Sequence, residues 1–584
     1  MVRYVAFLAV ALLLVQSAQA QEQSEKVNRS RSNSQSASAL KTEEAVLRRQ
    51  MAVARVRGFA ERILAFNDTK IKTIAVARIA NLLWVDDEPY ARQLFLKAVD
   101  LSASQNETSS TSSKLKPGEL AYLRRQVIAQ IARRDAAWAK RLTEGDSFSN
   151  SAVNRMQTNV EIALDHVVNG DVKSGAAFAE RSLQSGFSPW LVSVLKELRR
   201  KDEPAANALF PKTLERLVNE PAVDAEHLLY LGTYVFTSPK ADPVRDSDIQ
   251  VGVGRILVYD ITADRPNIPP GLVRAYLEAA TQILTRRISN PKYRPHYYAA
   301  CYLMLPKAKK FAPHLAPYIA AAMHALASDV PPELTQESAY KNLAATAPKD
   351  FDETLKEIED IPDEDSRDAR YLSLVFDLWH AGNYIKARSV ASRLSEREVR
   401  DRLAILIDFG EAARLLERGQ TAVAEETAGK LPIGIERAVL WLAVSRKRAA
   451  EGDSRRAAEA IDNALAAANK VDDAHRPFLL LNASSQLAHF HKTLASSTLA
   501  EAVREFNRQQ PEALAKVKWE QRVDAGPLWR DFPLKVKGVE FGFEQTLPPL
   551  VANDVEGVVA VVNDLKVEGA QAQSLLALAG ALLK

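Results

Sequence analysis

Cysteine is the residue that this 584-residue chain most clearly lacks, since Cys301 is the only one. A single cysteine cannot form an intrachain disulfide, so burial of apolar side chains has to hold the fold together. Cys301 lies in the apolar stretch from Tyr298 to Leu305, where a small buried side chain is a simpler interpretation than a reactive thiol. We therefore assign it no chemistry.

A surplus of charge of one sign is also lacking. The 77 basic side chains are offset by 73 acidic ones, and the basic clusters Arg199–Lys201 and Arg446–Arg448 have carboxylates close by. Proteins that bind nucleic acids usually carry a marked basic face. The sequence therefore predicts no nucleic-acid partner.

Long hydrophobic runs are missing after residue 20, so we expect no membrane span in the mature chain. The first twenty residues differ, because Arg3 precedes an apolar run from Tyr4 to Val15 and Ala18-Gln19-Ala20 follows as a small-x-small cleavage site. This pattern is typical of a secretory signal peptide, and the run is too short for a transmembrane anchor. We expect an exported bacterial protein, periplasmic or secreted, without a lipid-anchoring cysteine.

Motifs for nucleotides and other cofactors are missing. Gly429-Lys430-Leu431 lacks the hydroxyl residue of a phosphate-binding loop and has Ala424 where the first glycine should stand. Gly252 and Gly254 lack the third glycine of a dinucleotide loop and follow no clear strand. We predict no cofactor.

The sequence also lacks the residue spacings that are typical of metal sites. His489 and His491 are the closest pair of histidines, but their side chains would point about 200° apart on a helix. The acidic run Asp350–Asp368 lacks the ordered Asp-x-Asp-x-Asp-Gly spacing of a calcium loop, so a solvated turn between helices is the simpler interpretation. We predict no metal site.

Catalytic signatures are weak in the same way. Ser193 and Lys196 have the spacing of a serine–lysine acyl enzyme, but no second signature follows them. Glu540 and Glu544 are the nearest candidates for the paired carboxylates of a glycoside hydrolase, yet too little chain surrounds them for a catalytic domain. We assign no catalytic residue.

What the chain does contain is the 3.6-residue apolar spacing of amphipathic helices, with little alternation of period two. We therefore predict an all-α fold, with a loop insertion near Ser102–Lys114. The expected divisions are a signal peptide (1–20), a disordered Ser/Gln-rich linker (21–42), an N-terminal helical repeat region (43–236), a middle helical region with irregular loops (237–350), a repeat region (351–508) and a C-terminal segment (509–584).

A repeat emerges when segments are aligned on a glycine that ends one helix and opens a turn. Gly382 precedes Ala387, Ala391 and Leu394; Gly419 precedes Ala424, Ala428 and Leu431; Gly452 precedes Ala457, Ile461 and Ala464, always at +5, +9 and +12. A small residue at +5 lets the second helix approach the first, and the other two positions lie on the same face. Such hairpins need neighbours on both sides, which favours an array.

This order resembles the tetratricopeptide repeat. Trp441 and Ser445 stand before Gly452 where that family places an aromatic and a small residue. The equivalent positions hold Tyr371 and Val375 in the first copy and Asp408 and Ala412 in the second, so Val375 and Asp408 depart from the pattern.

The clear resemblance covers about 371–470. Looser half-matches are Asp86 with Ala91, Phe95 and Ala98, and Gly170 with Gly175, Ala179 and Ser182. The resemblance implies a right-handed superhelical array of helical hairpins; an irregular helical bundle is the alternative.

The same resemblance implies a groove that binds a protein or peptide partner. The family's groove positions correspond to Leu372, Phe376, Trp379, Leu406, Phe409, Leu416, Leu442 and Arg446. These side chains are mostly apolar and suit an apolar or helical ligand. The alternative is that the register is one turn off and that they belong to the core.

The C-terminal segment has a different pattern. Phe532, Leu534 and Val536 alternate with polar residues and proline, and Gly538 precedes a second alternating run at Val539, Phe541 and Phe543. The pattern predicts a short β-hairpin. The last helix, expected over Gln571–Leu583, has little polar face, so it must be buried against the array or mediate self-association with another chain.

The interpretation that the sequence favours is an exported protein-binding or scaffolding protein of the cell envelope without catalytic activity. The alternative is an exported hydrolase of envelope polymers whose site is assembled from distant residues. Asn-x-Ser/Thr sites occur at Asn28, Asn67, Asn106 and Asn482.

Overall fold

The computed structural model describes residues 43–103, 117–144, 152–220, 225–236, 246–251, 254–259, 266, 268–286, 288, 290–335, 351–471 and 474–584. Helices dominate these residues, and the strands form two small antiparallel hairpins, so the predicted all-α class is confirmed. The expected signal peptide, the 21–42 linker, Asn28, Asn106 and most of the Ser102–Lys114 loop lie outside the described residues. None of the described helices is both long enough and apolar enough to cross a lipid bilayer.

The chain divides into two compact units, each assembled from segments far apart in the sequence. The first unit contains the described residues up to Leu94, together with Arg448–Val517 and Gly538–Lys584. The second unit contains Phe95–Lys447 and the short segment Lys518–Lys537. Helices α3 (Glu88–Ala103) and α21 (Ile435–Ala450) cross a boundary between the units.

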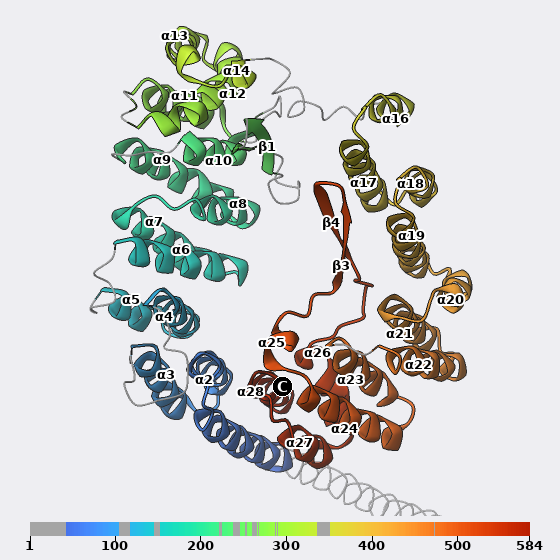
Figure 1. The fold of residues 1–584 in the computed structure, drawn as a ribbon. Helices are drawn as coiled ribbons and strands as arrows, with labels where there is room; N and C mark the ends of the chain where they lie inside the picture. Colours follow the sequence, from blue (N-terminus) through green and yellow to red (C-terminus); the bar gives the residue numbers. More distant parts are fainter. Residues whose placement is uncertain are drawn as a thin grey trace, which may run out of the picture. The chain divides into compact units, whose positions relative to one another are not determined.

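The first unit brings the two ends of the described chain together. Residues 43–64 are helical. The further helices are α2 (Thr69–Leu83), α22 (Ser454–Ala468), α23 (Arg476–Leu487), α24 (Lys492–Arg508), α25 (Pro511–Ala515), α26 (Phe543–Asn553), α27 (Val555–Asn563) and α28 (Glu568–Leu582) (Figure 1). The apolar C-terminal helix α28 packs against α2, α26 and α27 and is buried from Ala570 onward along most of its length, as expected for a helix with little polar face.

Polar contacts reinforce this association of chain ends. The Glu568 carboxylate accepts hydrogen bonds from the backbone amides of Asn67 and Asp68, at 2.7 and 2.8 Å. Arg62 donates to the side-chain and main-chain oxygens of Asn563, at 2.6 and 2.7 Å. The Glu568 bonds satisfy backbone donors near the start of α2. Together with the Arg62 bonds, they fix the position at which the N-terminal segment meets the C-terminal helices.

The second unit is a succession of helices in which neighbours pack together, such as α6 with α7, α17 with α18 and α19 with α20. Its helices are α4 (Pro117–Ala132), α5 (Ala136–Glu144), α6 (Ala152–Val168), α7 (Val172–Ser185), α8 (Leu191–Lys201), α9 (Glu203–Asn219), α10 (Ala225–Phe236), α11 (Pro270–Leu284), α12 (Arg294–Phe311), α13 (Ala316–Leu326), α14 (Pro332–Thr335), α16 (Phe351–Glu359), α17 (Glu364–His380), α18 (Tyr384–Ala391), α19 (Arg397–Glu417) and α20 (Thr421–Lys430), with short 3-10 turns η2 (Pro291–Tyr293), η3 (Pro313–Leu315) and η4 (Ala327–Asp329). Cys301 is buried within α12, and burial raises the pKa of its thiol to about 12, as a structural cysteine requires.

The three glycines that align the repeat adopt the same conformation. Gly382, Gly419 and Gly452 have φ values of +74°, +79° and +81°, a left-handed conformation that costs glycine little. In each case the following residue donates its amide hydrogen to the carbonyl five residues back, at 2.9 Å, which is the pattern of a Schellman helix end. The glycines therefore stop one helix and turn the chain into the next.

The positions that follow these glycines are buried as the spacing predicts. All nine residues at +5, +9 and +12 lie in the core: Ala387, Ala391, Leu394, Ala424, Ala428, Leu431, Ala457, Ile461 and Ala464. The half-match at Gly170 has the same turn, with φ +94° and an amide of Asp171 that donates to the His166 carbonyl. There a Cβ on Gly175 would lie 2.4 Å from Val167 Cγ2, so the helices approach as closely as the pattern implies.

Two hairpins depart from the sequence-based expectations. β1 (Asp246–Val251) pairs antiparallel with β2 (Gly254–Tyr259) in a region expected to be irregular. Gly254 therefore begins a strand, and β1 is followed by this strand rather than by the helix that a dinucleotide loop requires.

The C-terminal hairpin exists but lies upstream of the predicted one. β3 (Glu520–Ala525) pairs with β4 (Leu528–Pro533), and the chain reverses at Gly526-Pro527 rather than at Gly538. A two-residue turn that opens with φ +55° suits the twist of the strands. Beyond Pro533, the Leu534 amide still donates to the Trp519 carbonyl at 2.8 Å. The alternating residues Leu534, Val536, Val539 and Phe541 are nevertheless buried. Their alternation therefore reflects burial of every second side chain and not a β-strand.

Candidate functional site

Most residues predicted for the groove lie in the core. Leu372, Leu406, Phe409, Leu416 and Leu442 are all buried, which agrees with the alternative interpretation that the sequence left open. Arg446 is exposed. The remaining two residues, Phe376 and Trp379, are half-buried on α17 and lie on a face that the chain itself covers.

The cover is the β3–β4 hairpin, which belongs to the same unit as α17. The ring of Phe532 on β4 meets Phe376 and Trp379 edge to face, with centroids 5.3 and 5.8 Å away and interplanar angles of 83° and 88°. Aromatic rings prefer this perpendicular arrangement because the positive edge of one meets the negative face of the other. Phe532 is thus held by the two aromatic residues that the sequence offered as ligand contacts.

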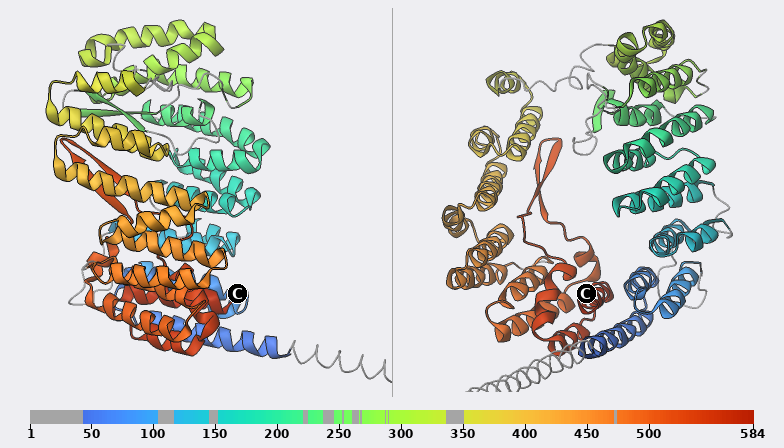
Figure 2. Two further views of the ribbon diagram at one scale, coloured as in Figure 1. Left: turned by 90° about the vertical axis from the view of Figure 1, so that its right-hand side faces the viewer. Right: turned by 180° about the vertical axis from the view of Figure 1, so that it is seen from behind.

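The hairpin follows α17 for almost its whole length. Its tip lies against the first turn of the helix, where a Cβ on Gly526 would be 2.5 Å from the Asp365 carbonyl oxygen. Near the middle, Arg530 donates to the Ser373 hydroxyl at 2.9 Å and lies 5.7 Å from the centroid of the Phe376 ring. Both strands also contact α17, and β3 contacts α19 (Figures 1 and 2). We call this surface of α17 and α19 the ribbon-binding face.

Trp379 has a second role in joining the two helices of this face. Its indole Nε1 donates to the Leu406 carbonyl of α19 at 3.1 Å. Gly410, one turn further along α19, makes the approach possible, because a Cβ there would lie 2.4 Å from Trp379 Nε1 and 2.7 Å from Cε2. The tryptophan is therefore part of the packing between α17 and α19.

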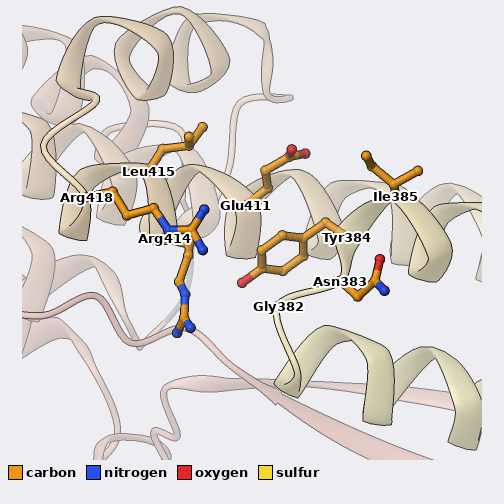
Figure 3. Close-up of a pocket in the computed structure, with 8 residues that line it drawn as sticks. All are labelled: Gly382, Asn383, Tyr384, Ile385, Glu411, Arg414, Leu415 and Arg418. Atoms are coloured by element: carbon orange, nitrogen blue, oxygen red, sulfur yellow. The ribbon is translucent and has the colours of Figure 1, made fainter.

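A small pocket opens beside the turn between α17 and α18. Its volume is about 350 Å³, and it is lined by Gly382, Asn383, Tyr384, Ile385, Glu411, Arg414, Leu415 and Arg418. The first four residues come from the turn and the start of α18. Glu411, Arg414 and Leu415 come from the C-terminal half of α19, and Arg418 is the C-cap of that helix (Figure 3). We call it the turn pocket.

Two guanidinium groups and one carboxylate line the turn pocket. Glu411 is engaged by Arg388, with 3.3 Å between the guanidinium and the carboxylate. Arg414 has only a long contact with Glu417, at 4.0 Å, and lies against the Gly382 turn, where its Nε would be 3.8 Å from a Cβ. Among the described residues, Arg418 has no ion pair or hydrogen bond. The two guanidinium groups that line the pocket are therefore only weakly paired.

Tyr384 adds a neutral donor to this pocket. Figure 3 shows its ring pointing from α18 toward the side chains of Arg414 and Arg418. Burial raises the pKa of the Tyr384 hydroxyl, against the opposing influence of the nearby Arg414. The hydroxyl thus keeps its proton at neutral pH and can donate a hydrogen bond. Ile385, which is 80% exposed, and Leu415 supply apolar surface.

The residues considered for catalysis and metal binding have structural partners. His491 caps α24, since its Nδ1 accepts from the Leu494 amide at 3.4 Å. Asp363 caps α17 by accepting from the Ser366 amide at 2.8 Å. Hydrogen bonding from the Ser366 side chain, together with this amide, lowers the pKa of the Asp363 carboxyl. Glu544 pairs with Arg78 at 3.2 Å. In the described part of the chain, no three His, Cys, Asp or Glu side chains gather closely enough to hold a metal ion.

The serine–lysine pair lies on one helix, α8. Burial lowers the pKa of Lys196, but no hydrogen bond joins its amine to Ser193. Of the glycosylation sites, Asn67 is exposed, whereas Asn482 is buried and donates its amide to the Glu540 carbonyl. Modification of Asn482 would therefore require local unfolding.

Comparison with known proteins adds no further assignment. The sequence matches no family model, and none of the curated proteins is similar to it.

Tyr384, Arg414 and Arg418 were not among the binding residues predicted from the sequence. A signal for them was present, because Arg414 and Arg418 stand five residues and one residue before Gly419, at positions that hold Asp377 and Ala381 before Gly382. Residues that depart from a repeat are candidates for a role that the repeat does not need.

Proposed function

We propose that this protein is an exported binding or scaffolding protein of the bacterial cell envelope, built partly from tetratricopeptide-like hairpins and without catalytic activity. One observation supports this most directly: the ribbon-binding face holds an extended polypeptide through Phe532. A surface that binds the chain's own hairpin in this way has the chemistry to bind a partner's extended segment.

The energetics favour such an exchange. Burial of a phenylalanine side chain stabilises by roughly 1.5–3 kcal/mol, and an edge-to-face pair adds about 0.5–1.5 kcal/mol. A partner that presents an aromatic residue on an extended strand would make the same contacts with Phe376 and Trp379. It would bind by displacing the β3–β4 hairpin. Because the hairpin competes for the same face, it lowers the apparent affinity of the partner.

Export is supported by the charged, apolar and small-residue pattern of the first twenty residues. An exported protein with a single cysteine needs no oxidising compartment to fold, so the periplasm and the exterior are equally suitable locations.

The ribbon-binding face can be tested with the hairpin supplied as a separate peptide. Residues 518–537 are replaced in the full chain by a glycine–serine linker of equal length, and a fluorescent peptide of sequence 518–537 is titrated by anisotropy. We expect saturable binding, weakened at least about tenfold in a Phe532→Ala peptide and retained in a Trp529→Ala peptide, because Trp529 is 47% exposed.

Two results would reject the proposal. One is a folded linker variant to which neither peptide binds, or to which both bind equally. The other is a linker variant that has lost its helical circular dichroism, because the hairpin would then be a permanent part of the fold and the face would not be free for a partner.

A further inference from the structure

We propose that the turn pocket binds a small organic anion, in which a carboxylate or phosphate group is carried on an aliphatic body. This site is separate from the ribbon-binding face, and the two proposals can fail independently.

The anionic half of the ligand is indicated by the groups that surround the pocket. Arg414 has only a 4.0 Å contact with Glu417, the Arg418 side chain has no ion pair or hydrogen bond among the described residues, and the protonated Tyr384 hydroxyl adds a donor that carries no charge. Guanidinium groups match the geometry of carboxylate and phosphate oxygens.

The acidic side chains near the pocket leave its guanidinium groups only weakly paired. Glu411 accepts from Arg388, which also pairs with Asp408. Glu417, the partner of Arg414, is not among the lining residues and approaches only to 4.0 Å. An oxyanion in the cavity would therefore find donors that are only partly satisfied.

The aliphatic half is indicated by two apolar residues of the lining, one from α18 and one from α19. Ile385 is 80% exposed although it is a large apolar residue, and Leu415 lines the same cavity. Covering such side chains by an aliphatic chain contributes roughly 25 cal/mol per Å² of surface removed from water. A volume of about 350 Å³ accommodates a short-chain acid rather than a folded partner.

The other repeats argue that these residues are not needed for packing. Positions five residues and one residue before the turn glycine hold Asp377 and Ala381 in the first copy, and Lys447 and Glu451 in the third. Two residues after the glycine, Tyr384 is replaced by Thr421 and Ser454. The pair of arginines with a facing tyrosine therefore occurs once, at the pocket, while the buried positions of the repeat stay small and apolar.

The test uses the full chain and isothermal titration with defined probes. These are hexanoate, hexyl phosphate, acetate, inorganic phosphate and neutral hexanamide. We expect saturable binding of hexanoate or hexyl phosphate, weaker binding of acetate and inorganic phosphate, and no binding of hexanamide. Whichever of the two hexyl probes binds more tightly identifies the headgroup.

Variants assign any binding to the pocket. The double variant Arg414→Gln/Arg418→Gln is expected to bind at least about tenfold more weakly. The matched control Arg397→Gln, also on α19 and 86% exposed, should bind as the natural chain does. Ile385→Ser should reduce the preference for hexanoate over acetate.

The proposal is overturned if no probe saturates, if hexanamide binds as well as hexanoate, or if the double variant binds as well as the control. It is also overturned if the arginines only stabilise the C-terminal end of α19, in which case the double variant melts at lower temperature and the natural chain shows no preference for anions. Because all substituted side chains are exposed or line the cavity, an unchanged melting temperature is expected for each variant.

Discussion

Trp379 lies where the repeat pattern places a ligand-binding side chain, yet its indole bonds to the Leu406 carbonyl and fills the space above Gly410. The pattern predicted Trp379 as a groove residue, but it could not show that Gly410 on α19 leaves room for its ring. The nine buried positions after the turn glycines were predictable because they depend on spacing within one hairpin. Contacts such as Trp379 with Gly410 depend on which residues of two helices meet.

Substitution of Gly410 tests this contact. A Cβ at Gly410 would lie 2.4 Å from Trp379 Nε1, so Gly410→Ala must push the ring away and disturb its bond to Leu406. We expect a loss of about 1–3 kcal/mol in the free energy of unfolding of this region, measured by hydrogen exchange of α17 and α19.

Gly429→Ala is the matched control. Gly429 is also helical, and a Cβ there would meet nothing within 4 Å. Alanine has the higher helix propensity, so this variant should gain about 0.5–1 kcal/mol. Equal stability of the two variants would contradict the proposed packing role of Gly410.

At the scale of elements, the β3–β4 hairpin shows what a period of two can and cannot reveal. Phe532, Leu534 and Val536 alternate and are all buried, but only the first lies in a strand. Gly526-Pro527 supplies the turn that the alternating pattern placed at Gly538. The strands expected on either side of Gly538 are therefore not formed, and the hairpin lies upstream because its position depends on the turn chemistry and on the surface of α17 beneath it.

Phe532→Ala is expected to loosen the hairpin from α17. The side chain is fully buried between two aromatic rings, and truncation of such a phenylalanine costs about 3–5 kcal/mol. Hydrogen exchange of the amides in β3, β4 and α17 should quicken accordingly. Trp529→Ala, on the same strand but half exposed, should change these rates little, and similar effects of both substitutions would show that Phe532 does not anchor the ribbon.

At the scale of the whole molecule, the unit boundaries could not be predicted from the sequence. Helical periodicity shows that α2 and α28 each have an apolar face, but not that residues 500 positions apart share one unit. From the sequence, the last helix was expected either to be buried within the chain or to mediate self-association. In this structure α2 and α26 pack against it, together with the Glu568 bonds to Asn67 and Asp68.

Truncation after Val567 is therefore expected to expose α2 rather than to separate an oligomer. Removal of α28 takes away both an apolar neighbour and the Glu568 carboxylate. Exchange of the α2 amides should rise roughly a hundredfold or more, which corresponds to about 2.7 kcal/mol. Glu568→Gln, which keeps an acceptor, should have a much smaller effect. A truncated chain with unchanged α2 protection and half the native mass by sizing would favour self-association instead.

The contact of α28 with α2 also dictates the order in which the chain can reach its final form. A ribosome releases α2 hundreds of residues before α28 exists, so the apolar side of α2 has no permanent cover during most of synthesis. The contact between α2 and α28 forms slowly because it closes a loop of that length. Until it forms, apolar surface of α2 stays exposed and can bind chaperones. The first unit can therefore reach its final form only after the last helix has been synthesised.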